Sequence, residues 1–346
     1  MAKVTNFSQI RKNKPKVFQR LYDKNTRTAP VSNLQTFGDG ATIPDEDAYK
    51  IIDESLYDSI EDNMVIANDI LGEGNLVNDH NDISKTIVEW YGVDADVDAN
   101  TSMSGQPKSD GGGATSNVNT LPIPIIRSGW TMPKRNFDAF QQDSISQEDL
   151  DTRMIAAAGR SIGKEVESLF LEGSNITVNN SSIPGLLNHP NVNTGSLNEK
   201  WNTTFDSDLV GDIESDILEM INDAQNNGAP AGNSVLDVYY PTDATPNLTH
   251  TINDNNSRTL MDILEEKPAI NSVNPAYYLD GLSDYTVLVV YRSPEFMSVE
   301  RGADFSNVEW EPTGQMVHNW ASLGAMVLRV TPSYNDKLPV VKYTKS

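Results

Sequence analysis

Four oxygen-bearing side chains occupy alternate positions in one short stretch of the chain: Asp94, Asp96, Asp98 and Asn100. On a strand they would share one face, because strand side chains alternate with a period of two, and oxygen ligands suit a hard cation. An EF-hand loop does not fit, since its required glycine falls at Ala99 and its closing glutamate at Gly105. We therefore interpret the stretch as a solvated strand face and expect no bound metal.

Residues that could do catalysis are scarce. The chain has no cysteine, which excludes disulfides, thiolate nucleophiles and cysteine-based metal sites. The four histidines are far apart in sequence and form no close metal pair: His80, His189, His250 and His318. The stretch from Asn78 to Asp82 around the first of them predicts a polar turn. No phosphate-binding loop, nucleophile elbow or zinc-protease motif is present. We expect no catalytic residue, no cofactor and no enzymatic activity.

The charge is distributed unevenly. The net charge is −23, yet residues 1–30 carry eight basic side chains against one acidic one, a net +7. Arg11, Lys12, Lys14 and Lys16 form the densest part of this arm. A basic arm on an acidic body favours docking between subunits. Contact with nucleic acid or a disordered, solubilising tail are the alternatives. The acidic body argues against wide DNA-binding surfaces and would suit a halophilic host.

Composition sets further bounds. The 346 residues are 38% hydrophobic, enough for one large domain or two subdomains. No apolar run is long enough to span a membrane, and the N-terminus lacks the apolar core of a signal peptide. We expect no membrane association and no secretion by that route.

The first elements along the chain frame a long hairpin. A helix is predicted from Pro44 to a point before Gly72 or Gly74. Strand-like residues 86–93 and 119–135 flank a Gly-rich segment. A two-stranded hairpin of this kind buries little of itself and is marginal alone. We therefore expect it to lie on a neighbouring subunit.

Amphipathic helices and strands follow. Apolar residues at three- to four-residue steps predict a long helix over 146–173 and another over 206–227. A strand is predicted over 235–240, a short helix over 257–266, and further strands over 285–292, 295–301, 315–331 and 338–344. This mixture indicates an α+β fold.

The order of four segments resembles the Hong Kong 97-type major capsid proteins of tailed viruses and the related encapsulins. These are the helix around Ile52–Ser55 with the following 68–74, the strand 121–140, the helix 150–173, and Gly185-Leu-Leu-Asn-His-Pro-Asn-Val192. By this resemblance residues 1–43 would form an N-terminal arm, 44–74 a helix leading into the peripheral region, 75–135 the extended loop, 136–204 the spine helix and peripheral domain, 205–315 the axial domain, and 316–346 the C-terminal strands returning to the core.

The resemblance implies a structural role. The protein would self-assemble through pentamers and hexamers into an icosahedral head around double-stranded DNA, with separate scaffold and portal proteins and, in decorated shells, cement proteins. It would be assembled in the host cytoplasm and reside in the virion capsid. An encapsulin shell around an enzyme, or an unrelated acidic hydrolase, are the alternatives. Since the helical prosegment of some relatives is missing, scaffolding would come from another protein, or this is the mature form.

Assembly contacts are predicted at the loop and the arm: Arg11, Lys12, Lys14, Lys16, Trp90, Tyr91, Lys108 and Trp130. The tryptophans and the tyrosine are chosen because aromatic side chains dominate interface energetics, although they could instead pack within their own hairpin. Some relatives cross-link a loop lysine to an asparagine with the help of a buried glutamate. Lys108 and Asn335 could fill the first two roles, but no glutamate follows Glu311, so we expect no cross-link.

Overall fold

The computed structural model describes residues 56–61, 64–80, 82, 84–95, 114–134, 147–178, 181–231, 235–253, 256–310, 317–333 and 336–346. The chain divides into two units. Unit 1 comprises residues 1–77, 125–167 and 304–324, and unit 2 comprises residues 78–124, 168–303 and 325–346. The predicted α+β class is confirmed.

A five-stranded mixed sheet forms the centre of unit 2, in the order β11-β8-β12-β15-β7. Its strands are β7 (Asn193–Ser196), β8 (Leu236–Tyr240), β11 (Ile270–Pro275), β12 (Tyr285–Tyr291) and β15 (Val340–Lys345). β12 runs antiparallel to β8 and β15, whereas β11 is parallel to β8 and β7 is parallel to β15. Every residue of β8 is buried, as are five of β12, which explains their continuous apolar sequences.

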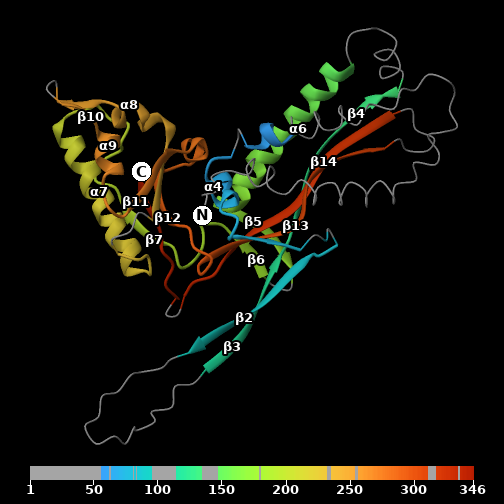
Figure 1. Ribbon diagram of the computed structural model, residues 1–346, viewed down its shortest axis with the longest axis horizontal. Helices are drawn as coiled ribbons and strands as arrows, with labels where there is room; N and C mark the ends of the chain where they lie inside the picture. Colours follow the sequence, from blue (N-terminus) through green and yellow to red (C-terminus); the bar gives the residue numbers. More distant parts are fainter. Residues whose placement is uncertain are drawn as a thin grey trace, which may run out of the picture. The chain divides into compact units, whose positions relative to one another are not determined.

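Helix α7 (Ser207–Asn226) packs on this sheet beside α9 (Leu260–Glu265) (Figure 1). Asp206 caps α7 by accepting a hydrogen bond from the Leu209 N–H. The predicted apolar stripe is buried in the core: Leu209, Ile213, Ile217, Met220 and Ala224. Burial of such a stripe is the main stabilisation of a helix on a sheet.

Shorter elements complete unit 2: β5 (Gly173–Val178), β6 (Ser181–Pro184), η2 (Thr242–Ala244), α8 (Thr245–Leu248), β9 (Thr251–Asn253), β10 (Asn256–Thr259) and η3 (Tyr277–Gly281). The predicted helix over 257–266 begins too early, because residues 257–259 belong to β10. Thr259 and Asp262 form a reciprocal capping box that starts α9 at Leu260. Strand β11 was not predicted, since its sequence contains only two apolar residues besides a proline.

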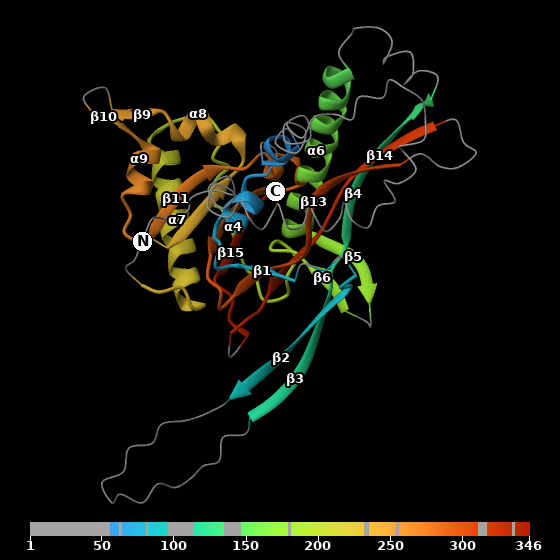
Figure 2. The same ribbon diagram turned by 45° about the vertical axis from the view of Figure 1, so that its right-hand side comes forward.

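The predicted hairpin is present. Strands β2 (Ile87–Ala95) and β3 (Ala114–Pro122) pair antiparallel along their whole length, and Figure 2 shows them as a long two-stranded ribbon. The single strand predicted over 119–135 is wrong in detail. It is divided into β3 and β4 (Ile125–Pro133), because Pro122 and Pro124 cannot donate backbone hydrogen bonds.

A second sheet has the order β1-β13-β14-β4, with β1 (Val77–Asp79), β13 (Met297–Trp310) and β14 (Val317–Val330). β13 extends well beyond its predicted end at 301.

Two helices of unit 1 meet at a buried carboxylate. The helix predicted from Pro44 is interrupted: residues 56–61 are helical, Met64 and Val65 are not, and α4 covers Ile66–Gly72. Its predicted start lies outside the described residues. Glu167, on the long helix α6 (Gln147–Leu171), accepts hydrogen bonds from the backbone N–H groups of Ile66 (3.0 Å) and Ala67 (2.8 Å). This acceptor from another helix stabilises a separate start of α4. Among the described helices, none is long and apolar enough to cross a membrane.

Candidate functional site

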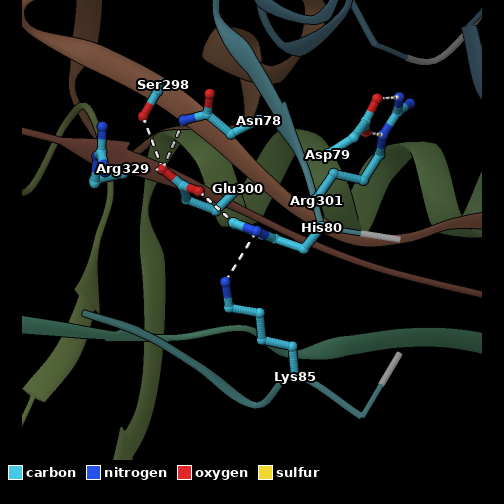
Figure 3. A network of polar contacts seen from close by, with 8 residues as sticks. All are labelled: Asn78, Asp79, His80, Lys85, Ser298, Glu300, Arg301 and Arg329. Carbon is cyan, nitrogen blue, oxygen red and sulfur yellow. Dashed lines mark hydrogen bonds and ion pairs between the residues drawn. The ribbon is translucent and has the colours of Figure 1, made fainter. Parts of the chain in front are cut away.

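A buried carboxylate lies at the base of the β2–β3 hairpin. Glu300 on β13 is 1% exposed and is surrounded by polar side chains from three strands (Figure 3). Its Oε1 accepts hydrogen bonds from Asn78 Nδ2 at 3.0 Å and Ser298 Oγ at 3.1 Å, and lies 3.0 Å from Arg329 Nη1. Its Oε2 lies 2.8 Å from His80 Nε2. The charge is therefore paired and hydrogen-bonded, as a buried charge must be.

These contacts determine the charge state of Glu300. Burial by itself would raise its pKa, because the charged form loses hydration. The hydrogen bonds from Asn78 and His80, the positive charge of Arg329 and the Ser298 hydroxyl outweigh burial and hold the pKa of Glu300 below its usual value. Glu300 is accordingly a carboxylate at neutral pH. It accepts hydrogen bonds and is a poor proton donor.

Lys85 extends this network towards the hairpin. Its Nζ lies 2.9 Å from His80 Nδ1, so His80 bridges Lys85 and Glu300. The backbone N–H of Lys85 donates to Asp82 O at 3.1 Å, and β2 begins two residues later. Beside this bridge, Arg301 donates two hydrogen bonds to Asp79. We call the residues shown in Figure 3 the base network.

A second contact joins the hairpin to β14. The guanidinium of Arg329 lies 5.3 Å from the ring centroid of Trp90 on β2, a cation–π distance. Arg329 therefore contacts both the buried carboxylate and the hairpin. The arrangement offers anchoring and orientation of a long ribbon. Within the described part of the chain, no group of three or more His, Asp or Glu side chains could hold a metal ion.

The polar turn predicted over Asn78–Asp82 is wrong for its first two residues. Asn78 and Asp79 belong to β1, and the His80 N–H donates to Arg301 O at 2.9 Å. Asn78 on this strand and His80 just after it both contact Glu300, while Asp79 between them contacts Arg301. The alternation of Asn78 and His80 around Asp79 was the available signal. Its partner was not visible in the sequence, because Glu300 is 220 positions away from His80.

Three of the predicted assembly residues lie on described strands. Trp90 packs against Arg329, and Trp130 on β4 stacks on Trp320 with ring centroids 5.9 Å apart and an interplanar angle of 8°. Tyr91 is opposite Val118 in the β2–β3 register, and its side chain is outside the described part. The other five lie outside the described residues, as does Asn335: Arg11, Lys12, Lys14, Lys16 and Lys108. Of the four alternating oxygen-bearing residues weighed as cation ligands, Asp94 lies on β2, and the others, within 96–100, lie outside the described residues. Whether any of these residues contacts another subunit stays a prediction.

Large apolar side chains are exposed on and just after the hairpin. Val118 on β3 is 56% exposed, and Ile125 at the start of β4 is 58% exposed. Isolated exposed apolar residues are common on protein surfaces. Val118, however, lies on a two-stranded hairpin, an element that is only marginally stable in isolation.

The fold is similar to those of solved particle shells. A virus-like particle from Pyrococcus furiosus matches with a TM-score of 0.56 and 15% identity, over 85% of this chain and 98% of that one. The capsid of Myoviridae phage XM1 matches with a TM-score of 0.61 and 13% identity, over 80% and 91%. The capsid of an empty GTA particle matches with a TM-score of 0.52 and 9% identity, over 79% and 89%. No curated protein matches the sequence.

These similarities show the fold and confirm the resemblance noted from the sequence. Residues 38–343 match the model of a family of unknown function, DUF6260. The chain therefore belongs to the DUF6260 family and has the Hong Kong 97-type capsid fold.

Proposed function

We propose that this protein is the major capsid protein of a tailed virus. The observation that carries the proposal is the match to the XM1 phage capsid over 80% of this chain and 91% of that chain. So extensive a match leaves little room for an inserted catalytic domain. We infer a structural protein that carries out no reaction.

Assembly would rest on the hairpin and the basic arm. The β2–β3 ribbon, with Val118 exposed on it and Ile125 exposed just after it, would lie on a neighbouring subunit, and contacts of this kind close into pentamers and hexamers. Residues 1–43 would be the arm, 44–74 the helix leading into the peripheral region, 75–135 the extended loop, 136–204 the spine helix and peripheral domain, 205–315 the axial domain, and 316–346 the returning strands. Contacts between subunits are assigned to Arg11, Lys12, Lys14, Lys16, Trp90, Tyr91, Lys108 and Trp130.

The proposed partners follow from this role. The shell would enclose double-stranded DNA, and a largely acidic chain would repel the packaged phosphates rather than bind them. Separate scaffold and portal proteins, and cement proteins where the shell needs them, would complete the head. Assembly would take place in the host cytoplasm, and the finished protein would reside in the virion capsid. The acidic composition suits a host that lives in brine.

An encapsulin-type shell around an enzyme is the second candidate. The match to the virus-like particle of Pyrococcus furiosus over 98% of that chain favours keeping it. The two candidates share the fold and differ in their contents.

Electron microscopy of the high-mass fraction from the native source separates the candidates. We expect icosahedral shells filled with concentric layers of DNA. Small shells that contain protein density and no nucleic acid would establish the second candidate. Absence of any assembly larger than a hexamer would contradict both. Treatment with nuclease before and after shell disruption provides the control, since enclosed DNA is protected only in intact shells.

A further inference from the structure

We propose that His80 is a pH-dependent latch at the base of the hairpin, which holds Lys85 while its ring is neutral and releases Lys85 when the ring is protonated. The hairpin would thus be fixed at its base near neutral pH and freed there in mildly acidic solution. The latch is formed within unit 2 by the base network (Figure 3).

The neutral state follows from the donors and acceptors around the ring. A lysine ammonium has only donors, so His80 Nδ1, 2.9 Å from Lys85 Nζ, must accept and cannot carry a proton. The carboxylate of Glu300 only accepts, so His80 Nε2, at 2.8 Å, must donate. The only ring form that satisfies both neighbours is the neutral tautomer with its proton on Nε2.

Protonation breaks one of these two contacts. A second ring proton would be carried by Nδ1, where it would face the N–H groups of Lys85. The positively charged imidazole N–H of His80 and the ammonium of Lys85 would then face each other at hydrogen-bond distance and repel. The contact between Nε2 and Glu300 would gain charge attraction at the same time. The hydrogen bond between His80 and Glu300 would therefore persist, whereas the Lys85 ammonium would move away from His80 towards solvent.

The other charged groups of the network do not substitute for Lys85. Arg329 is bound to Glu300 from β14, and on the neighbouring positions of β1 and β13 Asp79 and Arg301 are bound to each other. Asp82, in the turn that holds Lys85, accepts the Ser84 N–H and hydroxyl. Glu300, with its lowered pKa, stays ionised while a histidine titrates between about pH 5 and 8.

The position of Lys85 gives the latch its effect. Lys85 immediately precedes Thr86, whose carbonyl accepts the Ile123 N–H at 2.8 Å where the two hairpin strands leave the body of unit 2. Release of Lys85 would leave the Trp90–Arg329 contact and the hydrogen bond between the Thr120 and Ser181 hydroxyls (2.6 Å) as the points about which the hairpin base could turn. This inference deepens the proposed function: in a shell, the direction of the hairpin towards its neighbour would depend on pH.

Amide hydrogen exchange of the full chain tests the latch. Exchange of peptides covering 84–95 and 114–124 is measured at about pH 8 and about pH 5, and is corrected with unstructured reference peptides for the intrinsic pH dependence. In the wild type we expect roughly tenfold faster exchange of the hairpin base at the lower pH, the effect of losing one hydrogen bond to a charged group. In His80→Gln the corrected exchange should not depend on pH. In Lys85→Met it should be fast at both pH values.

His250→Gln is the matched control, because His250 lies elsewhere in unit 2, stacked on Phe205. It should retain the wild-type response. Equal corrected exchange of the wild type at both pH values, or a pH response that survives in His80→Gln, would overturn the latch. Should His80→Gln fail to fold, Lys85→Met decides alone. Its corrected exchange at about pH 8 should equal that of the wild type at about pH 5, and a slower exchange would overturn the latch. The readout needs only a folded subunit, so absence of shells in the microscope would contradict the proposed function without touching this result.

Discussion

At the scale of single residues, two buried glutamates have pKa values shifted in opposite directions, although burial acts to raise both. Glu300 is held below its usual pKa because three neighbouring side chains donate to it and Arg329 adds a positive charge. For Glu167, burial raises the pKa and outweighs the backbone N–H groups at the start of α4 that donate to it, and Asp69 adds a negative charge nearby. The difference shows that a buried carboxylate keeps its charge at little cost only when a cation is beside it.

Glu167 predicts a measurable pH dependence of stability. A carboxyl group whose folded pKa is raised binds its proton more tightly in the folded state, so stability falls as pH rises from the usual carboxyl pKa through the raised value. We expect Glu167→Gln to remove this fall while keeping one acceptor for Ile66 and Ala67. Urea unfolding midpoints between about pH 4 and 8 measure it.

Glu167→Ala provides the comparison. It leaves both N–H groups without an acceptor and should cost about 2 kcal/mol throughout the range. The interpretation fails if Glu167→Gln and the wild type lose stability equally as the pH rises.

At the scale of elements, the segment after α6 explains why a Gly-Leu-Leu-Asn sequence follows the long helix. The N–H groups of Leu186 and Leu187 donate to Phe170 O (2.9 Å) and Leu171 O (2.7 Å), and so satisfy carbonyls at the helix end. Asn188 Nδ2 adds a bond to Glu172 O at 3.0 Å. Gly173 turns the chain with φ +76°, a conformation that favours glycine.

Close approach at this helix end predicts that Gly185 cannot be replaced. A Cβ on Gly185 would lie 2.3 Å from Leu171 O and from Gly173 N, so the backbone would have to shift. We expect Gly185→Ala to destabilise by about 3 kcal/mol, comparable with severe overpacking. Thermal or urea unfolding measures the change.

Gly211→Ala is the control for this substitution, because Gly211 lies within α7 and a Cβ added there would meet nothing within 4 Å. It should stabilise by about 0.5–1 kcal/mol through helix propensity. Loss of less than about 1 kcal/mol in Gly185→Ala would show that the helix end relaxes easily.

At the scale of the whole molecule, the uneven charge predicts salt-dependent assembly. Replacement of Arg11, Lys12, Lys14 and Lys16 by glutamine lowers the charge of residues 1–30 from +7 to +3. If the arm docks on acidic neighbours, the variant should assemble several-fold less at low salt and respond less to added salt, since screening removes the same attraction. Sedimentation of the assembled fraction over a salt series measures both effects.

A charge-conserving variant tests whether charge or side-chain identity matters. Arg11→Lys combined with Lys12→Arg, Lys14→Arg and Lys16→Arg should assemble as the wild type does. Unchanged assembly and unchanged salt response in the glutamine variant would assign the arm to another role, such as contact with nucleic acid or solubilisation.

The sequence by itself determined the features that depend on local periodicity. The apolar repeats predicted the two long helices to within two residues of α6 and α7, because a helix that packs on one face repeats its apolar residues at a fixed step. The paired strands flanking a Gly-rich segment and the order of segments shared with capsid proteins were equally readable. The positions of the charged residues alone revealed that residues 1–30 are basic while the rest of the chain is acidic.

The tertiary structure alone decided which distant groups meet. The start of α4 depends on Glu167, 101 positions away from Ile66, and the base network depends on Glu300, 220 positions away from His80. Neither partner could be selected from among 49 acidic residues, because no local pattern specifies a contact that sheet topology and register create. The predicted turn at Asn78–Asp82 was wrong at its first two residues, and strand β11 was missed, for this same reason: Asn78 and Asp79 belong to β1 and residues 270–275 form β11 through pairing with β13 and β8, which lie far away in the sequence.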